Sequence, residues 1–184
     1  MGGLSRGLAA ATGSGRVELP LRGDASGPVL AVSGSRSPQT RRQADAAAQA
    51  GWLVEPLRLD DADQASEVVA ALRAGRSVAL TSDDADLSGP AGALERIADA
   101  AASVIEAAVR AGATRRVIVC GGDTSSRVTR LLGIESLSIA ANPVANVVLL
   151  RSHASDPVVD GLELLLKGGQ VGPVDLFELV RAGA

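Results

Sequence analysis

The chain has 184 residues, of which 46% are hydrophobic, 1% aromatic and 21% charged, and its formal net charge at pH 7 is −3. This length suffices for one domain that buries a core without disulfides or structural metal ions. The acidic balance and the scarcity of aromatic residues beside arginine exclude a nucleic-acid partner, and no apolar run approaches the roughly 20 residues that cross a bilayer, so we expect no membrane partner and a cytoplasmic location.

The first half of the chain alternates short apolar runs with helical patterns. Pro38 suits the first turn of a helix, Gly51 and Gly75 are typical helix stops, and Pro56 favours an edge strand. We expect strands at residues 28–33, 52–59 and 77–81, and helices at residues 38–50 and 65–74.

The second half changes from this alternation to consecutive strands. A polar loop at 82–90 precedes a helix at about 91–111 and a continuous apolar run at 117–120, which is typical of a buried parallel strand. Strand-like runs at 137–140, 147–151 and 162–166 follow with no helix between them, and a helix at 173–181 closes the chain. The pattern predicts an α/β fold, a three-layer αβα domain with a mainly parallel sheet and a mixed or antiparallel C-terminal extension.

A glycine pair ends the apolar run at 117–120. Gly121 and Gly122 leave room for a ligand to approach the main chain, and Asp123, Thr124 or Ser125 can cap the helix that starts there. The free N–H groups of such a helix end, together with its dipole, attract anions. We interpret this turn as an anion site, with phosphate as the expected occupant.

Two further loops with small polar residues follow strands. One carries Ser33 and Ser35, and the other runs from Lys167 through Gly169 to Gly172. Ligands of open parallel sheets bind beyond the carboxyl ends of the strands, so we expect the three loops to converge on one nucleotide site. Each loop alone could be a simple turn, and Lys167, the single lysine, is interpreted as a charge on phosphate with a solvated surface lysine as the alternative.

The other polar residues carry weaker signals. Asp123 either caps its own helix, which we favour, or meets phosphate through Mg²⁺. The aspartates at 83, 84 and 86 are expected to be solvated rather than to bind metal. No partner acid or nucleophile lies at a recognisable spacing from His153, so it receives no chemical role, and Cys120 is expected to be a buried small hydrophobe. No residue is assigned as catalytic, and no metal site of the protein's own is expected.

Three motifs in order resemble the four-carbon acid sugar kinase family, and more narrowly its C-terminal nucleotide-binding domain. They are Ser33-Gly-Ser-x-Ser-Pro38 with Thr40 and Gln43, the Gly-Gly-Asp-Thr-Ser run from Gly121, and a late Lys-x-Gly-x-x-Gly. The likeness covers nearly the whole chain. It implies ATP and Mg²⁺ as cofactors, with ATP contacts from the serine loop (Ser35, with Ser33 near), from Gly121, Gly122, Asp123 and Thr124, and from Gly169.

The same resemblance implies a domain arrangement. Enzymes of the family phosphorylate four-carbon sugar acids such as 3-oxo-tetronates, which a separate N-terminal domain holds. On this basis residues 1–27 are interpreted as a partly flexible interdomain segment and residues 28–184 as the nucleotide-binding domain. The sugar-binding domain is absent from the sequence, so we expect the chain alone to be inactive, and a homodimer is left open.

The sequence departs from the family pattern at three places. Ser126 replaces a common glycine, Val171 stands where an aromatic residue is usual, and residues 143–146 replace a Pro-Gly-Val-Pro-like turn. These departures keep open an alternative, a non-catalytic nucleotide-sensing or interaction module derived from such a kinase. A nicotinamide-dependent oxidoreductase is less favoured, because no G-x-G-x-x-G motif follows the first strand.

Overall fold

A computed structural model describes residues 20, 23–82, 92–144 and 146–183. The loop expected at 82–90 lies almost wholly outside the described residues, as does most of the segment before the first strand. The strands are β1 (Leu30–Ser33), β2 (Leu53–Pro56), β3 (Val78–Thr81), β4 (Arg116–Cys120), β5 (Ser136–Val144), β6 (Val147–His153) and β7 (Glu163–Lys167). The helices are α2 (Pro38–Gln49), α3 (Asp63–Arg73), α4 (Ala93–Arg110), α5 (Gly122–Leu131) and α6 (Leu176–Arg181).

One seven-stranded sheet organises the domain, in the order β2-β3-β1-β4-β7-β6-β5. Strands β2, β3, β1, β4 and β7 are parallel, while β6 runs antiparallel to β7 and to β5. The predicted fold class is confirmed, including the edge position of β2 and the antiparallel extension. The chain leaves β1 toward β2 on one side and leaves β4 toward β5 on the other, so the strand order reverses between β1 and β4. Such a reversal opens a crevice at the strand ends.

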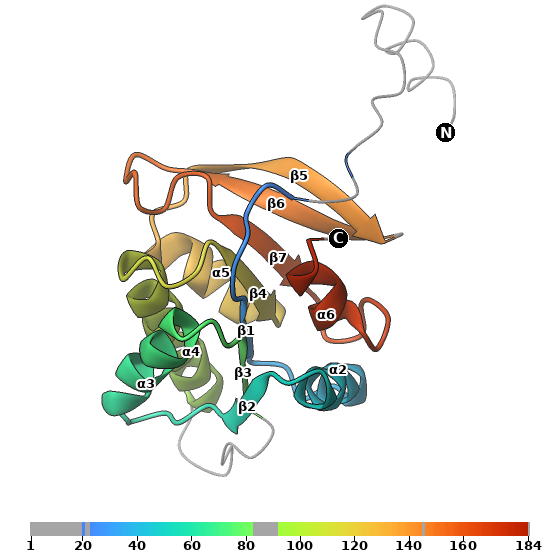
Figure 1. The fold of residues 1–184 in the computed structure, drawn as a ribbon. Coiled ribbons are helices and arrows are strands. Elements are labelled where there is room, and N and C mark those ends of the chain that lie inside the picture. The colour runs from blue at the N-terminus through green and yellow to red at the C-terminus, as the bar shows by residue number, and fades with distance from the viewer. Residues whose placement is uncertain (1–19, 21–22, 83–91, 145, 184) are drawn as a thin grey trace, which may run out of the picture.

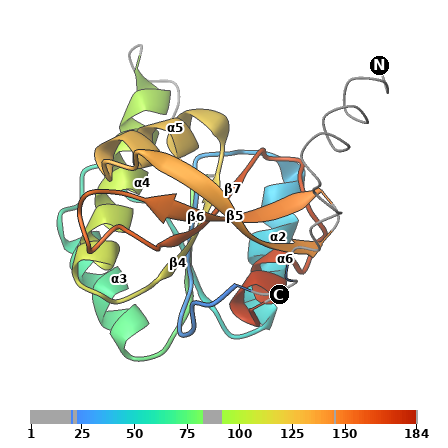
Figure 2. The same cartoon turned by 90° about the horizontal axis from the view of Figure 1, so that it is seen from above.

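Helices cover both faces of the sheet. Helices α2 and α6 lie together on one face, and α3, α4 and α5 lie on the other (Figures 1 and 2). The core on each face is almost wholly aliphatic, as the composition predicts. The exception is a pair of aromatic rings under α2 and α6, where Trp52 and Phe177 have centroids 6.0 Å apart.

The β5–β6 hairpin is longer than the sequence pattern predicted. Strand β5 continues to Val144, and its register against β6 shifts between Ile139 and Ala141. A bulge of this kind turns successive side chains to the other face. As a result Ile139 is half-exposed, at 51%, whereas Ala141 is buried in the α2-side core.

A buried ion pair lies where β4 and β7 begin, at the amino-terminal ends of the parallel strands. Arg116 and Glu163 lie 2.7 Å apart and are 3% and 1% exposed. The Glu163 carboxylate accepts the backbone N–H groups of Asp24 and Ala25, at 2.6 and 3.1 Å. Arg116 also donates to the carbonyl of Val180 at 2.8 Å, so one pair ties the entering chain, the sheet and α6 together.

Candidate functional site

The loop after β1 is folded by its own serines. The Ser33 hydroxyl donates to the Ser35 carbonyl at 2.9 Å and accepts the Ser35 N–H at 3.1 Å. Ser33 is buried, whereas Ser35 is half-buried and its Oγ accepts the N–H of Ser37 at 3.3 Å. Ser33 therefore shapes the turn, and Ser35 is the member of the pair that a ligand can reach.

Helix α5 starts directly after β4, and its first turn carries no side-chain cap. Gly121 is the N-cap, with φ 118° and no side chain, and the first helical bond joins Ser125 N–H to the Gly121 carbonyl at 2.9 Å. The prediction that Asp123, Thr124 or Ser125 caps this helix is wrong. The glycine takes the cap position one residue earlier, and the Ser125 hydroxyl turns back to the Gly121 carbonyl at 2.7 Å. No side chain thus caps the N–H groups of this first turn.

The loops after β1 and β4 touch each other through their glycines. The Gly34 N–H donates to the Cys120 carbonyl at 2.9 Å, which continues the ladder between the two strands. A Cβ added at Gly34 would lie 2.1 Å from Thr124 Oγ1, and one added at Gly121 would lie 3.6 Å from the Ser35 nitrogen. The main chain at position 34 can approach α5 this closely only because glycine has no side chain.

The loop after β7 packs against the serine loop from the other side. The Gly121 N–H donates to the Lys167 carbonyl at 2.9 Å, which joins this strand end to the second loop. A Cβ added at Gly169 would lie 2.3 Å from Ser35 Oγ and 2.8 Å from Ser37 Cβ. The predicted convergence of the three loops at one edge of the sheet is therefore confirmed.

Lys167 is buried beneath its loop. The residue is 4% exposed, and its ammonium donates to Thr40 Oγ1 at 3.0 Å and to the Gly169 carbonyl at 3.5 Å. The alternative of a solvated surface lysine is wrong. The ammonium lies behind the glycine loop and contacts α2.

The exposed part of the site consists of glycine and carboxylate. Gly122 and Asp123 are exposed, Thr124 is buried, and Ser125 is half-buried. A Cβ added at Gly122 would meet nothing within 4 Å. The first turn of α5 thus faces open space with its main chain and with one acidic side chain.

Cys120 lies at the end of β4, beneath the site. It is fully buried, and burial raises the pKa of its thiol to about 11, although Lys167 nearby opposes the shift. A thiol of this kind stays protonated at neutral pH and is a poor nucleophile. The expectation of a small buried hydrophobe is confirmed.

Other candidate residues lie outside this edge or outside the described residues. The aspartates at 83, 84 and 86 fall among the residues that the structure does not describe. The His153 ring lies at the end of β6, with its Nε2 2.7 Å from the Ser138 hydroxyl. Within the described ranges, His, Cys, Asp and Glu side chains form no group of three that could hold a metal ion.

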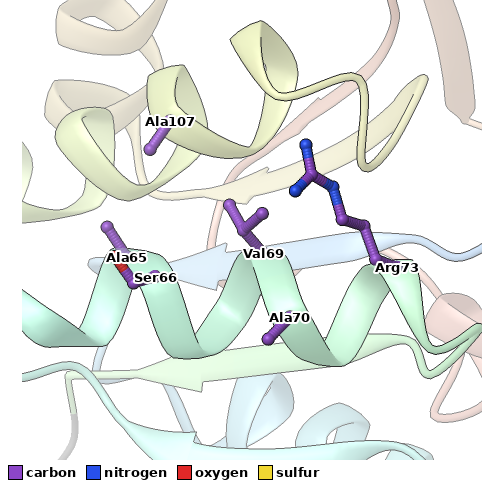
Figure 3. A pocket seen from close by; sticks show the side chains of 6 residues that line it. All are labelled: Ala65, Ser66, Val69, Ala70, Arg73 and Ala107. Carbon is purple, nitrogen blue, oxygen red and sulfur yellow. The ribbon is translucent and has the colours of Figure 1, made fainter.

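A groove of about 300 Å³ lies between α3 and α4 (Figure 3). It is lined by small and aliphatic side chains with one arginine: Ala65, Ser66, Val69, Ala70, Arg73 and Ala107. None of these residues belongs to the three loops. The polar side chains of the groove are those of Ser66 and Arg73, and the Arg73 guanidinium donates to the Ala111 carbonyl at 2.9 Å.

Sequence reasoning missed the side chains that hold the third loop. Ser37, the N-cap of α2, and three residues on the helix donate hydrogen bonds to carbonyls of residues 169–173; the three are Gln39, Thr40 and Gln43. Thr40 and Gln43 belong to the first motif, but their role is invisible in sequence because their partners lie about 130 positions away. The usable signal was polar residues spaced by three on a helix that otherwise buries alanine.

No described helix has both the length and the apolar character that crossing a membrane requires. This finding concerns residues 20, 23–82, 92–144 and 146–183.

Comparisons with known proteins give a family and a fold. Residues 30–177 match the model of the nucleotide-binding C-terminal domain family. A 3-oxo-isoapionate kinase from Paraburkholderia graminis is 35% identical over 181 residues, which cover 84% of this chain and 38% of that protein. A 3-oxo-tetronate kinase from Cupriavidus necator is 29% identical over 183 residues, covering 87% of this chain and 40% of that protein.

The chain thus spans about two fifths of the length of these relatives, at 38% and 40%. A solved structure of a Salmonella typhimurium protein has the same fold, with a TM-score of 0.70 and 22% identity. That match covers 99% of this chain and 45% of the other.

Proposed function

The chain belongs to the nucleotide-binding C-terminal domain family of the four-carbon acid sugar kinases, and we propose that it binds MgATP at the edge where its three loops meet. In this proposal the domain presents the terminal phosphate to a sugar acid of the 3-oxo-tetronate type. In the same proposal another part of the enzyme holds the sugar acid, since the chain spans only 38% and 40% of the length of the two kinases that it resembles.

The convergence of three glycine-containing loops is the observation that carries the proposal. Gly34 and Gly169 approach a neighbouring loop so closely that a side chain would collide there, and Gly121 has a φ of 118° that side chains rarely adopt. Close packing of this kind brings the main chain of three strand ends together, and main-chain N–H groups are suitable ligands for phosphate oxygens. The crevice also lies at the β1/β4 reversal, where open α/β sheets bind ligands.

Each candidate residue has a place in this proposal. The first turn of α5 receives the phosphates, because its N–H groups lack a side-chain cap and its dipole favours anions. The serine loop and the third loop flank it, and Lys167 supports the third loop from behind. The residues proposed to contact the nucleotide are Ser35, Gly121, Gly122, Asp123, Thr124, Ser125 and Gly169. Ser33 and Lys167 belong to the same site as supports, since Ser33 shapes the first loop and Lys167 holds the third.

Magnesium would enter with the nucleotide. The exposed carboxylate of Asp123 stands in the first turn of α5, where it would repel a bare triphosphate. A cation bound to phosphate oxygens and water removes this repulsion and suits a carboxylate ligand. Phosphoryl transfer depends mainly on positioning and charge stabilisation, which main-chain donors and Mg²⁺ supply.

The alternative is a module that binds nucleotide without catalysis. The observation that favours it is Val171, which packs its side chain against the core beside α6 rather than offering an aromatic surface to a ligand. The two functions differ in turnover. The kinase proposal predicts ATP hydrolysis or transfer only when a sugar acid and the sugar-binding domain are both present, whereas the alternative predicts none.

Isothermal titration calorimetry with MgATP tests the binding step. We expect one nucleotide to bind per chain, and weaker binding when Mg²⁺ is chelated. A phosphotransfer assay then combines the chain with a family sugar-binding domain and 3-oxo-tetronate. Absence of any heat with MgATP, with and without that domain, contradicts the proposal, and binding without turnover favours the alternative.

A further inference from the structure

The carbonyl groups of the third loop turn toward α2. The Gly169 carbonyl accepts hydrogen bonds from the hydroxyls of Ser37 and Thr40, the latter at 2.9 Å, and from the Lys167 ammonium at 3.5 Å. Three donors on one carbonyl leave the peptide after Gly169 little freedom to rotate. Thr40 and Lys167 are 1% and 4% exposed, so water does not compete for these bonds.

The second half of the loop is held in the same way. Gln43, which is fully buried, donates its amide Nε2 to the carbonyls of Val171 at 3.0 Å and Pro173 at 2.8 Å. Gln39 donates to the Gly172 carbonyl at 2.8 Å. Side chains from the first two turns of α2 therefore bind the loop along its whole length.

The lysine fixes the direction of the bonds. An ammonium group can only donate, so Thr40 Oγ1 accepts a hydrogen bond from Lys167. The threonine's own proton is then free for the Gly169 carbonyl, while Ser37 Oγ accepts the Thr40 N–H at 3.1 Å and gives its proton to the same carbonyl. With this assignment both hydroxyls donate to the Gly169 carbonyl, which favours one orientation of the peptide, although Ser37 Oγ also lies 3.2 Å from Thr40 Oγ1.

That orientation determines where the next N–H points. The peptide between Gly169 and Gln170 is trans, so its N–H is directed opposite to its C=O. The carbonyl points at α2, and α2 covers the face of the sheet opposite to α5 (Figure 2). The N–H of Gln170 is therefore turned away from α2, toward the side of the sheet on which α5 lies.

We infer that the main-chain N–H of Gln170 is a phosphate donor of the third loop, and that Thr40 and Lys167 are positioning residues that aim it. This inference rests on the proposed MgATP site and extends it to a group that no motif marks. Thr40 and Lys167 act through the Gly169 peptide without touching the nucleotide. Their removal should weaken nucleotide binding because the peptide is then free to rotate.

Calorimetry with MgATP on three threonine variants tests the inference. Thr40→Val removes the hydroxyl and should weaken binding about tenfold or more, the expected loss for one misdirected hydrogen bond to a charged group. Thr40→Ser keeps a hydroxyl and should restore binding to within about threefold of the natural protein. Thr114→Val is the matched control, because Thr114 is also buried and donates to the Pro28 carbonyl at 2.8 Å, at the opposite edge of the sheet.

Thermal unfolding of the same variants separates positioning from stability. We expect Thr114→Val to lower the melting temperature and to leave MgATP affinity unchanged. If Thr114→Val weakens binding as much as Thr40→Val, or if Thr40→Val binds as the natural protein does, the inference fails. If the natural protein itself does not bind MgATP, the proposed function fails.

The amide resonance of Gln170 gives a second test that needs no variant. In a ¹⁵N-labelled sample titrated with MgATP, the Gln170 amide proton should move downfield as a hydrogen bond to phosphate forms. An unchanged Gln170 resonance under conditions where the Gly122 amide shifts would overturn the inference and leave the proposed function intact.

Discussion

Gly122→Val should weaken nucleotide binding by roughly two or more orders of magnitude without unfolding the domain. Gly122 is the first residue of α5, it is exposed, and a Cβ added there would meet nothing within 4 Å. Its φ does not lie in the left-handed region, in contrast to Gly121 at 118°. A side chain at 122 is therefore free of strain and of protein contacts, and it projects into the space where we place the phosphates.

The size of the effect follows from the bonds that are lost. Hydrogen bonds to a charged phosphate contribute about 1.5–3 kcal/mol each. Displacing the phosphates from two N–H groups of α5 should therefore cost about 3–6 kcal/mol, or roughly 10²- to 10⁴-fold in the dissociation constant. The free energy of unfolding should change by less than about 0.5 kcal/mol, because glycine and valine are both poor helix formers and the site is exposed.

Calorimetry with MgATP and urea unfolding measure the two quantities. Gly122→Ala provides a graded comparison, since one methyl group fills less of the same space and should weaken binding by a smaller factor. If Gly122→Val retains both the fold and the affinity of the natural protein for MgATP, the phosphates do not lie over α5 and the reasoning is refuted.

Three further predictions concern the surroundings of the site. Gly169→Ala should lower the free energy of unfolding by about 1–3 kcal/mol, since the new methyl would lie 2.3 Å from Ser35 Oγ; Gly168→Ala, whose methyl would meet an atom only at 3.7 Å, should be neutral in the same urea titration. Arg116→Met leaves a glutamate that is 1% exposed without its partner and should cost about 3–5 kcal/mol by urea unfolding, with MgATP affinity unchanged because the pair lies at the other edge; a reduced affinity would show that the two edges are coupled. Burial raises the pKa of Cys120 from 9.0 to about 11, so the free energy of unfolding should fall as pH rises through this interval, and the thiol should react with a disulfide reagent at pH 8 only after unfolding; rapid reaction of the folded protein would contradict its burial.

Much of the fold could be predicted because its signals are local. Pro38 and Gly51 bracket α2 as expected, and Gly75 follows α3. The apolar run that became β4 is buried on both faces, which is why it lacks alternation. The register shift in β5 and the buried pair of Arg116 and Glu163 could not be predicted, because they depend on partners distant in the sequence.

The candidate site also has parts that local sequence signals predict and parts that depend on distant residues. The three loops could be found because glycine and serine cluster after strands, and their convergence follows from the parallel sheet. The cap of α5 was assigned wrongly, because Gly121 at φ 118° takes the position that polar side chains usually occupy. Lys167 is buried by contacts with α2, and its hydrogen-bond partner Thr40 lies 127 positions away in the sequence. No local pattern could therefore indicate its burial or this bond.

A crystal structure of the chain with magnesium and a non-hydrolysable ATP analogue tests the central claim most directly. We predict phosphate oxygens within hydrogen-bonding distance of the N–H groups of Gly122 and Asp123, with Gly169 and Ser35 at the rim. A nucleotide seated elsewhere, for example in the groove between α3 and α4, or phosphates turned away from α5, would contradict the account.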